Sequence, residues 1–224
     1  FEQQQTWNLG FRSMQPICGV VMTSLLAVIR HGPTEWNELG KIQGRTDIPL
    51  SERGKRVIQQ LQLPDFVSEI DWITSPLSRA IETGKLLGIT KMLIDDRLVE
   101  TNWGDWEGQV LWDLRAKYGQ EMLDNEKRGL DLTPPGGESP RQVCQRLQPL
   151  LFDIAASHQQ KLIGAITHKG VIRSLLSLAT GWDMSEKPPI RLDWKAIHIF
   201  SVDGKGTVKP HQLNVKFNRR NIVS

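Results

Sequence analysis

A histidine or an arginine follows several of the short apolar runs in this sequence. Arg30 and His31 come directly after residues 25–29, and His168 follows residues 161–166 in the same way. A histidine can act as a nucleophile at neutral pH, and an arginine forms paired hydrogen bonds with a phosphate. A single histidine after a strand is more often a structural hydrogen-bonding group, so its meaning depends on what accompanies it.

Two further reactive residues have comparable positions. Arg79 lies at the start of a predicted helix after the apolar run at residues 72–74, and Glu100 follows the run at residues 92–94. Because open α/β sheets place their ligands at the carboxyl ends of parallel strands, we expect all these side chains to meet at one sheet edge. One imidazole can attack a phosphorus atom, guanidinium groups can hold its oxygens, and a carboxyl group can protonate the leaving oxygen.

Each of these residues also has an ordinary structural explanation. Arg79 can form a surface ion pair, Glu100 can cap a loop, and His168 can be a hydrogen-bonded core histidine. Asp105 and Glu107 lie close to Glu100 in the sequence and compete with it for the role of acid. The remaining histidines lack comparable neighbours, and we assign them structural roles: His158, His198 and His211.

Motifs of other reaction classes are absent from the sequence. It contains no histidine pair or Cys/His cluster with zinc spacing, no Gly-x-Ser-x-Gly turn and no Walker-type phosphate loop. A metal site is therefore disfavoured. Cys18 and Cys144 match no disulfide framework, which is typical of a protein in a reducing cytoplasm.

The composition favours a folded domain. Hydrophobic residues make up 39% of the 224 residues and charged residues 24%, which supports a packed core. The formal net charge of +3 is modest, so nucleic acid is not an expected partner. No apolar stretch is long enough to span a membrane, so a membrane is not an expected partner either.

Short apolar runs alternate with helical patterns along the chain. This alternation predicts an α/β fold, a three-layer sandwich whose mostly parallel central sheet is flanked by helices. Residues 196–202 and 207–213 flank a glycine-rich turn and predict a C-terminal hairpin. We expect residues 1–21 to be an N-terminal extension, either foreign to the native protein or poorly ordered, and residues 22–224 to form one domain. The predicted strands are 25–29, 72–74, 92–94 and 161–166, and the predicted helices are 51–63, 78–87, 109–128, 139–154 and 169–180.

The motifs that carry these residues resemble, in order, those of the histidine phosphatase superfamily, the phosphoglycerate mutase-like or two-histidine phosphatases. The resemblance covers roughly residues 24–180. Each motif alone is unspecific, but the series is highly specific. The matching segments are residues 30–37, 43–51 with Gly54, 75–80, 98–100 with 104–108, 135–139 and 167–173.

The resemblance implies a role for each candidate residue. His31 would be the nucleophile that becomes phosphohistidine, and Glu100 would protonate the leaving group and later help to activate water. No metal or organic cofactor would be needed. The other residues would bind the substrate: Arg30, Arg79 and His168 around the phosphate, Asn37 as a further donor, and Gln43 and Gly44 at the pocket entrance.

One residue departs from the family pattern. The second histidine of the family is usually followed by two glycines, whereas this chain has Lys169 and Gly170 after His168. A lysine here either adds a cation near the pocket, which would shift substrate preference, or points outward as the first residue of a helix. We favour the second interpretation.

The resemblance covers both phosphatases and mutases. Mutases of this family carry an insertion between the acidic residue and the second histidine, and the segment between Glu100 and His168 is short. We therefore expect a phosphatase that hydrolyses a small-molecule phosphomonoester. The alternatives are a cofactor-dependent phosphoglycerate mutase and a phosphate-binding regulatory module without catalysis.

Overall fold

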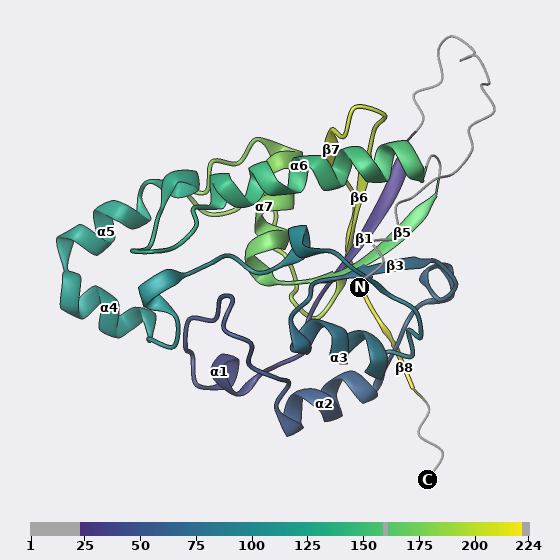
Figure 1. The fold of residues 1–224 in the computed structure, drawn as a ribbon, viewed down its shortest axis with the longest axis horizontal. Coiled ribbons are helices and arrows are strands. Elements are labelled where there is room, and N and C mark those ends of the chain that lie inside the picture. The colour runs from purple at the N-terminus through teal and green to yellow at the C-terminus, as the bar shows by residue number, and fades with distance from the viewer. Residues whose placement is uncertain (1–22, 159–160, 221–224) are drawn as a thin grey trace, which may run out of the picture.

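A six-stranded sheet with the order β4-β3-β5-β1-β6-β7 runs through the centre of the protein (Figure 1). The computed structural model describes residues 23–158 and 161–220. The first four strands of that order are parallel, and β6 and β7 are antiparallel, which confirms the mostly parallel sheet and the C-terminal hairpin. The strands of the sheet are β1 (Ser24–Arg30), β3 (Asp71–Thr74), β4 (Leu93–Ile94), β5 (Leu162–Thr167), β6 (Ile197–Val202) and β7 (Val208–Val215).

Helices cover both faces of this sheet, as the three-layer prediction requires. Along β1, Leu26 and Val28 pack against the side that carries α6 and α7, whereas Ala27 and Ile29 pack against the side that carries α2 and α3. The period of two is that of a strand buried on both faces. The α-helices are α1 (Glu35–Glu38), α2 (Glu52–Gln59), α3 (Ser78–Leu86), α4 (Leu111–Tyr118), α5 (Gln120–Glu126), α6 (Pro140–Ser157) and α7 (Lys169–Thr180).

The predicted helix at residues 51–63 is shorter than expected. Ser51 caps α2 as predicted, but the helix ends at Gln59. A proline disfavours helical backbone in the residue before it, so Pro64 prevents the helix from continuing through Leu63. The segment instead forms β2 (Leu61–Gln62), which pairs with β8 (Asn218–Arg219).

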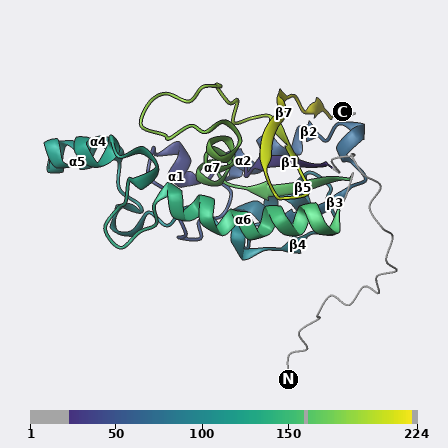
Figure 2. The ribbon, with the colours of Figure 1, turned by 90° about the horizontal axis from the view of Figure 1, so that it is seen from above.

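The predicted helix at residues 109–128 is two helices. Gly119 has φ +51°, a conformation that ends α4 and lets α5 begin in a new direction. The pair α4–α5 projects from the end of the molecule beyond the sheet (Figure 2). Leu114 and Met122 join it to Trp106 in a small separate apolar cluster.

Short 3₁₀ turns complete the regular structure: Asp65–Val67, Asp96–Leu98, Gly104–Trp106 and Gly129–Asp131. The expectation for residues 1–21 lies outside the described residues. Within the described ranges, no helix combines the length and the apolar character that crossing a membrane requires.

Gly164 in β5 allows the closest packing in the central sheet. A Cβ atom at this position would lie 2.3 Å from the Trp72 ring, so a rigid side chain or the strand itself would have to move. We expect Gly164→Ala to lower the free energy of unfolding by about 1–3 kcal/mol in urea titrations. Gly204→Ala, in the turn of the β6–β7 hairpin with nothing within 4 Å, should change it by less than about 0.5 kcal/mol. Equal midpoints for the two variants would contradict this account of the β5 packing.

Candidate active site

The register of the parallel strands brings the two predicted histidines together. Arg30 pairs with Thr167 at the end of the β1–β5 ladder, and the next residue of each strand is a histidine. The His31 backbone N–H donates to the Thr167 carbonyl at 2.9 Å, so the pairing extends into the site. The rings of His31 and His168 lie 5.1 Å apart between centroids, tilted by 55°.

Hydrogen bonding fixes the tautomer of His31. Its Nδ1 lies 2.7 Å from the Gly32 carbonyl oxygen, which can only accept, so Nδ1 carries the proton. Nε2 is then the nitrogen with a free lone pair. Burial, followed by the charges of Arg30 and Arg79, holds the pKa of His31 well below its usual range. The ring is therefore neutral at pH 7, as a nucleophile must be.

His168 has the opposite tautomer. Arg79 Nε–H donates to His168 Nδ1 at 3.3 Å, so Nε2 carries the proton and donates to Ser75 Oγ at 2.7 Å. Ser75 follows β3, the neighbour of β5 in the sheet. Burial, together with the charges of His31 and the nearby arginines, holds the pKa of His168 well below its usual range. This histidine is thus also neutral and is held on both ring nitrogens.

Arg79 is completely buried and ties a loop to the site. Its guanidinium donates to the Thr46 carbonyl at 3.0 Å and to the Gly44 carbonyl at 2.7 Å, in addition to His168. A guanidinium has five N–H donors, so two remain for an anion. The loop that carries Gln43 is therefore held in place by the same residue that adds positive charge beside His31.

Arg30 has a different environment. Its Nε is buried and has no hydrogen-bond partner among the described residues, and its Cζ lies 6.0 Å from the centre of the Trp194 ring. Burial lowers its pKa from the usual arginine value, and the nearby Glu100 partly opposes this. Arg30 is thus a desolvated cation whose donors are available to a bound anion.

Glu100 is a buried residue whose carboxyl group contacts the first turn of α7. It accepts hydrogen bonds from the backbone N–H of Thr101 at 2.8 Å and of Gly170 at 3.1 Å. Burial raises the pKa of Glu100, and this outweighs the opposing hydrogen bonds and the charges of Arg79 and Arg30. A carboxyl group whose pKa is raised by burial is better suited to act as a general acid.

The competing acidic residues have other environments. Glu107 accepts hydrogen bonds from the backbone N–H groups of Arg45, Thr46 and Trp103. Burial opposes ionisation of Glu107, but these bonds and the Thr46 hydroxyl together lower its pKa, so it holds the loop as a carboxylate. Asp105 is exposed and lies outside the cavity that Glu100 lines.

These residues surround a cavity of about 550 Å³. Of the predicted site residues, five line it, namely Arg30, His31, Asn37, Gln43 and Glu100. The other three, Arg79, His168 and Gly44, are adjacent but lie behind that surface. In the described ranges, no group of three or more His, Cys, Asp or Glu side chains is arranged to hold a metal ion.

Asn37 and Gln43 form one side of the cavity mouth. Asn37 Nδ2 donates to Gln43 Oε1 at 2.9 Å, and the Thr34 hydroxyl donates to the same oxygen at 2.8 Å. The buried Gln43 Nε2 has no partner in the described part of the chain, so it offers a further donor. Gly44 has its carbonyl directed to Arg79, and a Cβ there would lie 1.9 Å from Glu107 Oε1.

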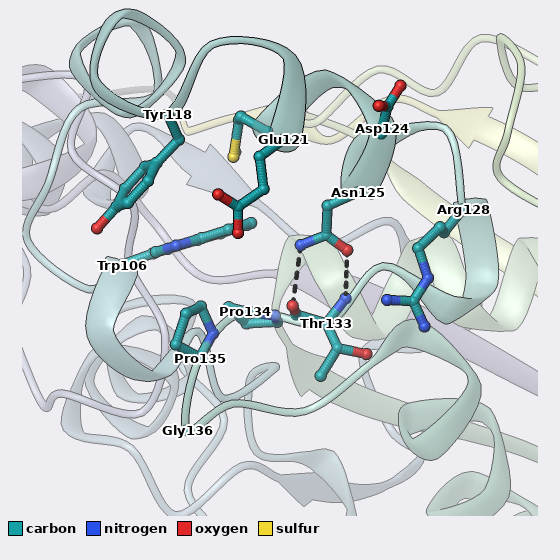
Figure 3. A pocket seen from close by; sticks show the side chains of 11 residues that line it. Trp106, Tyr118, Glu121, Asp124, Asn125, Arg128, Thr133, Pro134, Pro135 and Gly136 are labelled. Atoms are coloured by element: carbon teal, nitrogen blue, oxygen red, sulfur yellow. Dashed lines mark hydrogen bonds between the residues drawn. The ribbon is translucent and has the colours of Figure 1, made fainter.

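A second cavity of about 590 Å³ lies between α5 and the loop that leads to α6 (Figure 3). Tyr118 and Glu121 face it, and Trp106 forms part of its wall together with Met122. Asn125 joins the two sides through hydrogen bonds to both backbone groups of Thr133. Because Trp106 and Met122 also line the first cavity, these two side chains form the partition between the cavities.

A family model of the histidine phosphatase superfamily (branch 1) matches residues 26–214. The chain belongs to the histidine phosphatase superfamily. Its relatives in this superfamily have more than one activity. A 2,3-bisphosphoglycerate-dependent phosphoglycerate mutase of Parvibaculum lavamentivorans is 28% identical, over 87% of this chain and 98% of the mutase. Phosphoserine phosphatase 1 of Hydrogenobacter thermophilus is also 28% identical, over 72% of this chain and 78% of the phosphatase.

A solved structure shares this fold over most of its length. Bacillus stearothermophilus YhfR superposes with a TM-score of 0.74 at 26% identity, covering 87% of this chain and 98% of that one. The α/β architecture predicted from the sequence is thereby confirmed.

Two residues beside this histidine phosphatase site were assigned no role in the sequence-based analysis: Arg173, which lines the cavity, and Trp194, which lies beneath Arg30 and Lys169. Lys169 begins α7, as expected, but the favoured interpretation that it points outward is wrong, because its side chain lines the cavity beside the Trp194 ring. Arg173 could have been found because it lies one helical turn after Lys169. No sequence signal connects Trp194 with either residue.

The lowered pKa values of the site histidines predict how stability depends on pH. As the pH falls below about 6.5, the unfolded chain binds the proton of His31 before the folded protein does, so the free energy of unfolding decreases. The limit is about 1.4 kcal/mol per pH unit for each such histidine. Glu100 has the opposite sign: its raised pKa stabilises the fold at low pH, and this is lost as the pH rises through its folded pKa.

We expect His31→Gln to flatten the decline in stability between about pH 6.5 and 5, measured by urea unfolding at each pH. Glu100 is present in both proteins, so its opposite contribution is common to the two curves. His211→Gln changes an exposed histidine and should leave the slope as it is. An unchanged slope in His31→Gln would mean that His31 is protonated equally in the folded and unfolded states.

Proposed function

We propose that this histidine phosphatase superfamily member hydrolyses small phosphomonoesters through a phosphohistidine on His31. The observation that carries the proposal is the tautomer of His31, whose Nδ1–H bond to the Gly32 carbonyl leaves Nε2 free as a nucleophile. Arg30 and Arg79 lie near enough to lower the pKa of this histidine and supply the positive charge that a phosphoryl group needs.

The first step transfers the phosphoryl group to the enzyme. His31 Nε2 forms a bond to phosphorus while the bond from phosphorus to the ester oxygen breaks, and the departing oxygen takes the proton of Glu100. The alcohol then leaves. In the second step, water attacks phosphorus, the P–N bond breaks, and the Glu100 carboxylate takes a proton from that water. The products are an alcohol and inorganic phosphate, and His31 is regenerated.

The other predicted residues stabilise the transferred group. Arg30 is the cation at the cavity surface, and Arg79 adds positive charge and N–H donors from behind it, while the neutral His168 holds the Arg79 guanidinium in place. Asn37 and Gln43 contribute neutral donors at the cavity mouth. In this proposal, the residues at the cavity surface contact the substrate directly, and the buried residues behind them lower the pKa of His31.

Phosphoglycerate mutation is the second candidate. The Parvibaculum lavamentivorans mutase matches this chain over almost its whole length, and a mutase would use the same phosphohistidine. The two functions differ in the acceptor, which is water in one and a phosphoglycerate in the other. Incubation with 3-phosphoglycerate and its bisphosphate primer separates them, because a hydrolase releases inorganic phosphate and a mutase forms 2-phosphoglycerate.

Removal of the nucleophile tests the covalent intermediate. We expect a phosphomonoester to label the wild-type protein at His31 with acid-labile, base-stable phosphate, detected after rapid quenching. His31→Ala should not be labelled, and its kcat should fall by at least about 10³-fold, because no other group replaces the nucleophile. His211→Ala, a matched change of an exposed histidine, should keep both. A wild-type protein that is folded but never labelled would favour the phosphate-binding module without catalysis.

The acid can be tested through the leaving group. Glu100→Gln should slow hydrolysis of an alkyl phosphate by about 10²–10⁴-fold, because the alkoxide leaves only with a proton. The loss should be much smaller for p-nitrophenyl phosphate, whose phenolate is stable without one. Asp105→Asn removes the exposed competitor and should affect neither substrate. Equal losses on both substrates would contradict the general-acid assignment.

A further inference from the structure

Three cations lie together on one wall of the main cavity. Lys169 begins α7, Arg173 follows one turn later on the same face of the helix, and Arg30 ends β1 beside them. Trp194 connects two of these cations, with Lys169 Nζ 5.4 Å and Arg30 Cζ 6.0 Å from its ring centre. The three side chains therefore form one cluster, the α7 cation wall.

No carboxylate forms an ion pair with this wall in the part of the chain that the structure describes. Two carboxyl groups line the cavity. Glu126 is 2.7 Å from Arg115 and is thereby neutralised, and burial favours the protonated form of Glu100. Partial burial, followed by the positive charges of Arg30 and Arg173, lowers the pKa of Lys169, and Glu100 only partly opposes this, as expected for like charges placed close together.

Arg173 is oriented for an anion. Its Cζ lies 4.8 Å from the centre of the Trp182 ring, which is within cation–π distance. Arg173 lines the cavity and forms no ion pair with a carboxylate in the described residues, so its N–H donors are available to an anion. A positioned guanidinium with free donors is the usual receptor for a carboxylate or a phosphate.

The α7 cation wall lies next to Glu100, the proposed proton donor to the leaving group. Lys169 directly precedes Gly170, whose backbone N–H donates to Glu100, the proposed donor to the leaving oxygen. The phosphoryl group itself is served by Arg30 and Arg79 beside His31. Lys169 and Arg173 are therefore not needed for that phosphoryl group, and they line the same cavity, so they are available to another part of the substrate.

We propose that Lys169 and Arg173 form a second anion subsite, and that the substrate is a phosphomonoester whose leaving alcohol carries a second negatively charged group. The inference rests on the proposed phosphatase function, since it extends the same cavity. A negative group on Lys169 and Arg173 relieves the repulsion within the wall and places the ester oxygen beside Glu100. Trp194 and Trp182 hold the two cations in position for this contact.

Two substrates that differ in one group test the subsite. 3-Phosphoglycerate and glycerol 3-phosphate have the same skeleton, with a carboxylate in one where the other has a hydroxymethyl group. We expect the wild-type kcat/KM to favour 3-phosphoglycerate by about tenfold or more, as a charged hydrogen bond predicts. Lys169→Met and Arg173→Met should each reduce this preference by about tenfold. Lys209→Met, an equal loss of charge on exposed β7, should keep it.

Charge reversal gives an independent readout. Lys169→Glu should turn the preference towards choline phosphate, whose leaving alcohol is cationic, and away from 3-phosphoglycerate. A wild-type preference near one, or the same preference in Lys169→Met, would overturn the subsite while leaving the phosphatase function intact. If Arg173→Met loses its thermal unfolding transition, Lys169→Met and Lys169→Glu still decide the question.

Binding separates failure of the subsite from failure of the proposed function. If the wild-type protein turns over neither substrate, the proposed hydrolysis is wrong, and calorimetry with the same two compounds tests the subsite alone. Tighter binding of 3-phosphoglycerate than of glycerol 3-phosphate, lost in Lys169→Met, supports the subsite. Equal affinity of the two compounds overturns it.

Discussion

The register between β1 and β5 is the constraint on which the site depends. Arg30 lies opposite Thr167, so the two strands deliver His31 and His168 to the same edge at the same level. A shift by one residue would turn every side chain of the strand to the other face of the sheet. Both faces of β1 are buried, so the apolar packing that stabilises the fold also prevents that shift. The distance between the histidine rings is thus a consequence of the hydrophobic core.

Burial at this edge of the sheet favours the uncharged form of both the histidine rings and the Glu100 carboxyl group. It lowers the pKa of His31 and His168, which keeps both rings neutral, and it raises the pKa of Glu100, which favours the protonated acid. Arg30 and Arg79 keep their charge, because a guanidinium is too basic to lose it. The site is consequently positive, and a phosphate dianion both compensates that charge and favours the proton on Glu100.

The sequence predicted what depends on local pattern and on the end of a strand. The rule that ligands bind at the carboxyl ends of parallel strands predicted that four side chains lie close together, namely His31, Arg79, Glu100 and His168. The rule did not predict that Arg79 is buried and donates to the Gly44 carbonyl, because that contact joins residues far apart in the chain. Two further features could not be predicted from the sequence. The break between α4 and α5 at Gly119 and the approach of Trp194 to Arg30 depend on backbone turns and tertiary packing, which hydrophobic periodicity does not encode.

The first turn of α7 couples acid strength to substrate charge. A Cβ at Gly170 would lie 2.4 Å from Glu100 Oε1 and 2.3 Å from Thr101 Oγ1, so only glycine lets the carboxyl group reach this backbone. The resulting N–H bond stabilises the carboxylate, whereas burial stabilises the acid. Lys169, the residue before Gly170, adds a positive charge near Glu100, and this charge also favours the carboxylate. An anionic group bound to Lys169 would cancel that charge and return the balance to the protonated acid, so the substrate itself would prepare its proton donor.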